Sequence, residues 1–307
     1  MLADSGFQVP TTVAVRGNDA WVPQGQLGSY VGTPPLPPVT PPFKVDSVPL
    51  AGGGVGAAAI TLPGTDQLFP EGIAAAEDGT LYVGSMKTGK IFKVAAGSTT
   101  AAQFGVDGVL KRGALGLEVD AKHGLLWACD SDPGEGMAGG DLVGINLSDG
   151  KEAVRHAMAA GSLCNDMIVD PSGNVWATDS FVGAVYRLAD ADVMKANSAK
   201  VWLTDPKLVP PPNGFGANGI ALVGDKLFIS VTASSTTGAG MLVSVDPTSS
   251  TPASTLKVVN LTEGSAAAQL SGPDGIETLS DTELLIVENG FVAPSKARLV
   301  KATFDTL

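Results

Sequence analysis

The chain has 307 residues and a formal net charge of −12, with 19 Lys and Arg against 31 Asp and Glu. This balance argues against nucleic acid or an anionic membrane surface as a partner, because phosphate groups are bound by clustered Lys and Arg. The 39 Gly and 21 Pro argue against a coiled coil or a helical bundle, and the hydrophobic share of 44% argues against a disordered chain. No apolar run approaches the roughly 18 residues needed to cross a bilayer.

One sequence pattern recurs six times along the chain. Each copy has a lead residue, a short apolar strand, a turn rich in Gly or Asp, and a second apolar strand. The lead residues are Thr12, Glu71, Leu115, Asn165, Asn218 and Asp274. Each copy is long enough for four short antiparallel strands, which form the blade of a β-propeller. The sequence therefore predicts an all-β chain in which residues 1–307 form a single six-bladed β-propeller with four-stranded antiparallel blades.

The two ends of the chain are predicted to share one blade. The last copy has room for only three strands, because the chain ends soon after Arg298–Thr303. We expect Gly6–Pro10 to supply the fourth strand, so that pairing of the N- and C-terminal segments closes the ring and removes an open sheet edge. The Pro-rich segment Thr33–Phe43 cannot form a central strand and is expected as an extended loop within the first blade. Only Asp190–Ala199 has a helical composition.

The cysteines and the composition bear on the compartment. Cys129 and Cys164 are too few for a disulfide framework. We expect two buried thiols, with a single bridge between them as the alternative. Residues Met1–Pro10 lack the charged start and apolar stretch of a signal peptide. The few Lys and the many Ser, Thr, Ala and Gly residues suit an exported protein whose signal is not in this chain. A secreted or periplasmic location is favoured, and a cytoplasmic one stays open.

The phase of the repeat predicts which side chains meet at one mouth of the central channel. The first strand of a propeller blade lines the channel, so the lead residues converge there together with the ends of the second strands. Four lead residues carry side-chain oxygens: Glu71, Asn165, Asn218 and Asp274. Ca²⁺ takes roughly six to eight oxygen ligands from carboxylates, amides and water. The sequence therefore predicts a site for Ca²⁺, or for another divalent cation, that keeps positions open for water or substrate.

These residues lie in motifs that resemble a known family. The motifs are Phe69-Pro70-Glu71-Gly72, Asn165-Asp166-Met167, Ala217-Asn218-Gly219-Ile220 and Pro273-Asp274-Gly275-Ile276. Together with the repeats, they resemble the SMP-30/gluconolactonase/luciferin-regenerating-enzyme-like family, whose relatives in fold include paraoxonases and diisopropyl-fluorophosphatase. The resemblance implies a calcium-dependent lactonase with Glu71, Asn218 and Asp274 as direct metal ligands. It implies that Asn165 is a fourth ligand or contacts the substrate and the metal-bound water.

The chain departs from this pattern at its histidines. Paraoxonases have a histidine dyad near the site, whereas this chain has only His123 and His156, in a predicted turn at the far end and a predicted outer strand. We therefore expect both histidines to be structural. The family also has a second, structural metal. Its ligands cannot be assigned in this sequence, because they do not follow from any position of the repeat.

The predicted function is hydrolysis of a lactone or a related ester, a small-molecule substrate. The cation would polarise the carbonyl. Asp274 is the first candidate for the base that takes a proton from the attacking water, Glu71 is the second, and Asn165 assists as described above. Asp130 and Asp179, at second-strand ends, are further candidates for substrate contact. The expected apolar wall consists of Met86, Phe181, Phe215 and Phe291.

Two other functions stay open at this point. An organophosphate hydrolase would use the same residues, because a polarised phosphoryl oxygen and an activated water have the same needs. A non-catalytic propeller that binds a protein or a glycan is the other alternative, since the fold does not dictate function. Such a binding module has no need for four oxygen ligands in the same phase of the repeat.

Overall fold

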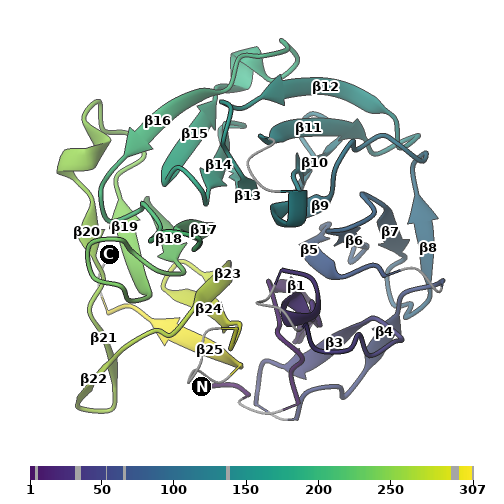
Figure 1. Cartoon of the computed structure of the whole chain (residues 1–307), viewed down its shortest axis with the longest axis horizontal. Coiled ribbons are helices and arrows are strands. Elements are labelled where there is room, and N and C mark those ends of the chain that lie inside the picture. The colour runs from purple at the N-terminus through teal and green to yellow at the C-terminus, as the bar shows by residue number, and fades with distance from the viewer. Residues whose placement is uncertain are drawn as a thin grey trace.

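Six antiparallel sheets surround a central axis in the computed structural model of the chain (Figure 1). The structure describes residues 1–3, 6–31, 36–52, 54–64, 67–135, 139–291 and 297–305. The arrangement confirms the six-bladed β-propeller that the repeats predict. Within the described residues, helical structure is limited to short 3₁₀ turns, and no helix is long and apolar enough to cross a membrane.

The first three blades follow one another from the N-terminal side, and each begins with its innermost strand (Figure 1). Their strands are β1 (Ala14–Arg16), β2 (Asp19–Pro23), β3 (Lys44–Pro49) and β4 (Ala59–Thr61); β5 (Pro70–Ala75), β6 (Leu81–Ser85), β7 (Ile91–Val94) and β8 (Ala101–Phe104); and β9 (Ala114–Asp120), β10 (Leu125–Asp130), β11 (Asp141–Asn146) and β12 (Glu152–Ala157).

The remaining three blades repeat this order, and a separate hairpin precedes the last one. Their strands are β13 (Cys164–Val169), β14 (Val175–Asp179), β15 (Ala184–Leu188) and β16 (Lys200–Thr204); β17 (Ala217–Val223), β18 (Lys226–Val231), β19 (Met241–Val245) and β20 (Lys257–Val258); the hairpin β21 (Leu261–Glu263) and β22 (Ala266–Ala268); and β23 (Pro273–Ser280), β24 (Glu283–Glu288) and β25 (Arg298–Thr303). The 3₁₀ turns are η1 (Leu27–Ser29), η2 (Pro133–Glu135), η3 (Asp190–Asp192) and η4 (Pro252–Ser254).

The core fills the spaces between neighbouring blades. Every residue of β10 and of β14 is buried, because both faces of a second strand are covered by other blades. Trp176 of β14, for example, belongs to one apolar cluster with Ile220 and Ile229 of the fifth blade. Strands buried on both faces are expected to be continuous apolar runs in the sequence.

Most inner strands have a register shift at the same point of the repeat. The pairing with the second strand skips residues directly after the first residue of β5, β13, β17 and β23. Bulges of this kind redirect the side chains next to them. Glycine follows the lead residue in these strands, except in β13, because the inner strands approach closely. A Cβ on Gly72 would lie 2.1 Å from the carbonyl oxygen of Leu115, and one on Gly219 would lie 2.6 Å from that of Asp274.

The ring is closed by N-terminal residues, as predicted, but not by the predicted ones. Ala3 pairs with Leu299 of β25, whose backbone N–H donates to the Ala3 carbonyl at 2.9 Å. The expected strand Gly6–Pro10 instead runs inside the first blade, where the Gly25 N–H donates to the Val9 carbonyl at 3.0 Å. The segment is only one residue away from the start of the first repeat, so it cannot leave that blade. The expectation for Gly6–Pro10 was wrong.

The long connection between β2 and β3 lies in the first blade. It contains η1, and residues 36–43 form no strand, in agreement with the expected loop. Thr33–Pro35 of this Pro-rich segment lie outside the described residues. The Gln26 side chain fixes the connection through two hydrogen bonds with the backbone of Thr40, at 2.9 and 2.8 Å. The helix expected from the composition of Asp190–Ala199 is present only as the single 3₁₀ turn η3.

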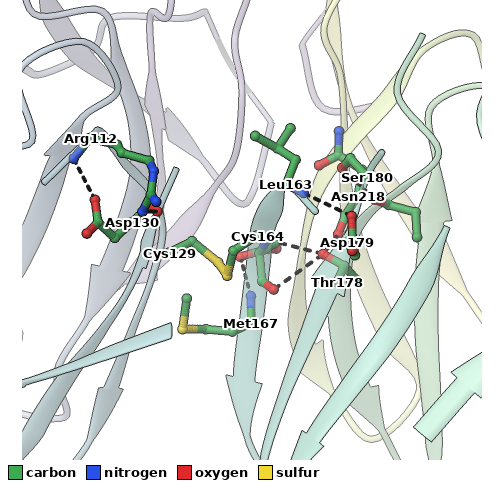
Figure 2. Close-up of a disulfide and its surroundings, with 12 residues drawn as sticks. Arg112, Cys129, Asp130, Leu163, Cys164, Met167, Thr178, Asp179, Ser180 and Asn218 are labelled. Carbon is green, nitrogen blue, oxygen red and sulfur yellow. Dashed lines mark hydrogen bonds between the residues drawn. A yellow bond between two sulfur atoms is a disulfide. The ribbon is translucent and has the colours of Figure 1, made fainter. Parts of the chain in front are cut away.

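The two cysteines form a disulfide, which corrects the expectation of two thiols. Cys129 at the end of β10 is bonded to Cys164 at the start of β13, with a Cα–Cα distance of 5.1 Å (Figure 2). The bond joins the third and fourth blades. Sequence spacing could not reveal it, because only the ring geometry brings the end of one second strand next to the start of the following inner strand.

Candidate functional site

A pocket of about 260 Å³ lies at the end of the channel where five of the six lead residues gather; the sixth, Thr12, lines the opposite opening instead. Its described lining includes Glu71, Asn165, Asn218 and Asp274, each from the inner strand of a different blade. Leu115, the lead residue of β9, lines the same pocket. The turns between first and second strands line the opposite opening of the channel, as at Gly17, Gly79 and Pro171. The phase of the repeat therefore brings the four oxygen-bearing side chains together.

Hydroxyl groups from neighbouring blades fix the backbone of the lead residues. The Thr11 hydroxyl donates to the Glu71 carbonyl at 2.9 Å. In the same way, Thr178 of β14 donates to the carbonyl of Asn218, and Ser230 of β18 donates to that of Asp274. Each of these bonds connects a blade to the next one around the ring. The positions of the lead residues therefore depend on the closed ring rather than on single blades.

The orientation of the Asn218 amide follows from its hydrogen bonds. The Thr232 hydroxyl donates its proton to the Pro273 carbonyl at 2.9 Å, so that it can only accept from Asn218. Asn218 Nδ2 donates to Thr232 Oγ1 at 2.9 Å. Asn218 Oδ1 is buried and has no hydrogen-bond partner among the described groups. Thr232 therefore leaves the amide oxygen of Asn218 as a free ligand atom in the wall of the pocket.

Asn289 orients the carboxylate of Asp274. The backbone N–H of Phe291 donates to Asn289 Oδ1 at 2.9 Å, which identifies the other amide atom as nitrogen. Asn289 Nδ2 then donates to Asp274 Oδ2 at 2.9 Å. Burial raises the pKa of Asp274 to about 7, although hydrogen bonds from Asn289 and Asn218 oppose this shift. Without a cation, Asp274 therefore titrates near neutral pH.

Glu71 is the second buried carboxyl of the pocket. Burial raises its pKa well above the usual value, and the negative charges of Asp274 and Asp166 add to the shift. Its Oε2 atom is buried and has no hydrogen-bond partner among the described groups. An unpaired buried carboxylate is unfavourable, so that Glu71 is either protonated or balanced by a positive charge.

Three further carboxyls lie deeper in the channel, toward its opposite opening. They are Glu118 of β9, Asp166 of β13 and Glu277 of β23. Burial raises the pKa of Glu118 to about 8 and that of Asp166 to about 7. The pKa of Glu277 is also raised well above its usual value by burial and by its neighbours Glu118 and Asp166. The channel is thus acidic along its length.

The residues of the pocket could hold a divalent cation such as Ca²⁺. Two of their oxygens, Glu71 Oε2 and Asn218 Oδ1, are buried without a partner, and such an atom costs about 1–3 kcal/mol when it stays unsatisfied. All four donor groups are hard oxygen ligands, and the two carboxylates balance a double positive charge. The described residues contain no cluster of three or more His, Cys, Asp or Glu suited to a metal. A cation here would therefore depend on the amides of Asn165 and Asn218.

The residues predicted to form the apolar wall lie in or next to the pocket. Met86, Phe215 and Phe291 line the pocket. Phe181 is not part of its lining but stacks on Phe215, with ring centroids 5.7 Å apart. Phe181 therefore supports the wall from behind.

Asp130 and Asp179 do not line the pocket. The carboxylate of Asp130 accepts hydrogen bonds from the backbone N–H groups of Lys111 and Arg112 and pairs with Arg155 at 2.6 Å. Asp179 Oδ1 accepts from backbone N–H groups, including that of Leu163 at 3.0 Å (Figure 2). Both carboxylates order the loops beside the disulfide.

Both histidines lie away from the pocket. His156 is buried, and its Nε2 lies 3.0 Å from the carbonyl oxygen of Val193. His123 contacts Asp120 through Nδ1 at 2.7 Å and Asp190 through Nε2 at 3.2 Å. Both histidines join the third blade to the fourth, through Val193 and Asp190, which agrees with the structural role expected for them.

Some lining residues were not predicted because they belong to loops outside the repeat. They are Leu27, Val31, Pro133, Pro211 and Asn213. The long connection after β2 was visible in the sequence as the largest spacing between repeats. Its position over the pocket was not visible, because it depends on contacts with the second and third blades.

Comparisons with known proteins support the fold. No model of a known protein family matches the sequence, and a search of the curated proteins finds no match. Among solved structures, the chain is similar to a luciferin-regenerating enzyme, with a TM-score of 0.65 and 11% identity over 97% of this chain and 92% of the other.

Two lyase structures are also similar. One is virginiamycin B lyase from Staphylococcus aureus with quinupristin, with a TM-score of 0.59 and 12% identity over 98% of this chain and 87% of the other. The second is a streptogramin B lyase, with a TM-score of 0.54 and 15% identity over 96% and 94%. At these identities, the likeness establishes a shared propeller fold.

Proposed function

We propose that the protein is a calcium-dependent hydrolase of lactones or related esters, similar to the SMP-30/gluconolactonase group. The carrying observation is the set of four oxygen-bearing side chains in one pocket, two of which have buried oxygens without partners. A propeller that only binds a protein or glycan would have no use for this set. The three similar structures are named as enzymes, a luciferin-regenerating enzyme and two lyases, which supports a catalytic role for this fold.

The metal ligands in this proposal are Glu71, Asn165, Asn218 and Asp274. When bound, Ca²⁺ supplies positive charge that stabilises the negative charge developing on the carbonyl oxygen of the substrate. Thr232 and Asn289 are positioning residues, since they orient the Asn218 amide and the Asp274 carboxylate. Loss of a residue of this kind typically lowers metal affinity or activity by about 10–100-fold.

Asp274 is the proposed general base. It accepts a proton from the water that attacks the acyl carbon and returns it to the alkoxide oxygen when the ester C–O bond breaks. In the metal-free protein burial raises the pKa of Asp274 to about 7, and the charge of a bound cation would lower it, which keeps the carboxylate ionised and able to accept the proton. The hydrogen bond from Asn289 to Oδ2 fixes the orientation of the carboxylate that accepts the proton. Glu71 is the second candidate for this role.

The apolar wall holds the remainder of the substrate. Met86, Phe215 and Phe291 contact its alkyl or aryl part and exclude bulk water from the polar groups. The volume of about 260 Å³ is at the small end for ligand pockets, which favours substrates the size of a monocyclic lactone.

The test is hydrolysis of a panel of lactones, aryl esters and organophosphates, in a chelator and after Ca²⁺ is added back. We expect ester or lactone hydrolysis that disappears with chelation and returns with Ca²⁺. Asp274→Asn should lower kcat by about 100-fold or more, as is usual for loss of a general base. Asp281→Asn, the same change in an exposed turn, is the matched control.

Three results would contradict parts of this proposal. Hydrolysis that is unaffected by chelation would refute the metal mechanism. A preference for organophosphates would mean that the same residues catalyse the hydrolysis of phosphotriesters. Inactivity on the whole panel would favour the binding module.

A further inference from the structure

A segment of the first blade reaches over the second blade to the third. It consists of residues Gln24–Val31, here called the roof segment, and includes η1. Its Leu27 and Val31 line the pocket. Figure 1 shows η1 in purple and η2, which follows β10, in teal, both near the central axis. The residue at the start of η2, Pro133, lines the same pocket.

Tyr30 holds the roof segment in this position. Its ring stacks on Phe69 at the edge of the second blade, with centroids 4.9 Å apart. Its hydroxyl donates to Asp132 Oδ2 in the third blade at 2.6 Å. The other oxygen of Asp132 accepts from the Gly134 N–H at 2.7 Å, so that the carboxylate is held in place. Tyr30 thereby fixes Leu27 and Val31 opposite Pro133.

The ring of Tyr30 lies directly against Gly134. A Cβ built on Gly134 would be 2.8 Å from Tyr30 Cζ, closer than such atoms approach. Gly134 has no left-handed backbone conformation, so that it is needed here for space rather than for its φ angle. A Cβ on Gly134 would also lie 2.9 Å from the Tyr30 hydroxyl oxygen, so that a change at Gly134 and a change at the hydroxyl perturb the same anchor of the roof segment by different means.

The described lining of the pocket offers few partners to polar substrate groups. Apart from the four proposed ligands, the polar side chains are Asn213, Thr232 and Asn289. Thr232 and Asn289 already use their polar atoms in the bonds that orient Asn218 and Asp274. No Lys, Arg or His belongs to the described lining. A sugar-like substrate would therefore find few side-chain partners for its hydroxyl groups among the described lining residues.

We propose that the roof segment, held across the second blade by the Tyr30–Asp132 hydrogen bond, makes the pocket selective for lactones or esters with an unhydroxylated alkyl or aryl part. Leu27, Val31 and Pro133 enclose that part from one side, and Phe215 and Phe291 from the other. This inference rests on the proposed function, because it takes the four oxygen ligands as the site of the carbonyl group.

The expected selectivity is large. An apolar pocket rejects one added hydroxyl by about 100-fold. A lactone with several hydroxyl groups should therefore bind at least 100-fold more weakly than an alkyl lactone of similar size. Loss of the hydrogen bond between Tyr30 and Asp132 is expected to lower this ratio about tenfold.

The experiment measures binding, so that it does not depend on catalysis. Two non-hydrolysable lactams are titrated calorimetrically into the full chain with Ca²⁺ present, one with a hexyl substituent and one with the hydroxyl groups of a sugar. The variants are Tyr30→Phe, which keeps the ring, and Gly134→Ala, which displaces it. Tyr82→Phe, at a buried tyrosine in the second blade that does not line the pocket, is the matched control.

We expect the hexyl lactam to bind at least 100-fold more tightly than the hydroxylated one, and both roof variants, but not Tyr82→Phe, to reduce this ratio. Equal or tighter binding of the hydroxylated lactam, binding of neither lactam, or an unchanged ratio in both roof variants would overturn the inference. Selective binding without hydrolysis of any corresponding lactone would support the inference and refute the proposed function, which separates the two.

Discussion

Removal of the Cys129–Cys164 disulfide is expected to destabilise the protein and to weaken its candidate metal site. The two cysteines are 35 residues apart in the sequence, and a cross-link over a loop of this length stabilises a folded chain by about 4 kcal/mol through the entropy of the unfolded state. For a chain of 307 residues, this corresponds to a decrease in Tm of about 6 °C. Both sulfur positions are completely buried, so that Cys129→Ala/Cys164→Ala also leaves small cavities that add to the loss.

The bond also has a local consequence for the pocket. Cys164 directly precedes Asn165, one of the four proposed ligands, and the bond ties this inner strand to β10 of the preceding blade (Figure 2). The double variant should therefore bind Ca²⁺ more weakly at a temperature at which it is still folded.

Thermal unfolding and calorimetric Ca²⁺ titration test this prediction. The single variant Cys129→Ala separates the cross-link from the side chains, since it loses the bond but keeps Cys164. It should be destabilised nearly as much as the double variant. An unchanged Tm in both variants would refute the stabilising role of the bond. A lower Tm with unchanged Ca²⁺ affinity would refute its role in positioning Asn165.

Two further predictions concern the channel and the positioning of the ligands. Burial raises the pKa of Glu118 to about 8, from 4.5, so that in chelator the free energy of unfolding should fall as pH rises between these values. Glu118→Gln should remove this loss of stability, which has an upper limit of about 5 kcal/mol. In denaturant unfolding, the variant should be more stable than the unmodified protein at pH 8 but not at pH 5. An equal increase in stability at both pH values would contradict the assignment. Thr232→Val should weaken Ca²⁺ binding about tenfold in a calorimetric titration, because the Asn218 amide loses the hydroxyl that orients it. Thr232→Ser keeps the hydroxyl and should keep the Ca²⁺ affinity. Equal affinities in the two variants would refute the positioning role of Thr232.

The fold could be predicted because each blade has the same recognisable pattern in its local sequence. Gly72 and Gly219 mark the places where inner strands approach each other, and the apolar second strands mark burial on both faces. The same periodicity placed Glu71 and Asp274 at one end of the channel, since equivalent positions of equivalent blades must face the same way. This part of the site required no knowledge of contacts between distant segments.

Features that depend on contacts between blades could not be predicted. The bond between Cys129 and Cys164 and the Tyr30–Asp132 hydrogen bond each join segments whose meeting depends on the closed ring. Asp130 and Asp179 occupy the expected second-strand ends, but their carboxylates face loop N–H groups rather than the pocket. Sequence phase gives the position of a residue on a strand, whereas the partner of its side chain is decided by the loops of neighbouring blades.

Calorimetric titration of the metal-free protein with Ca²⁺ tests the central claim most directly. We predict one site whose affinity falls at least tenfold in Asn218→Ala and in Glu71→Gln, while Asn260→Ala, in an exposed loop, leaves it unchanged. Absence of Ca²⁺ binding, or binding that neither pocket variant weakens, would contradict the assignment of these residues to a metal site.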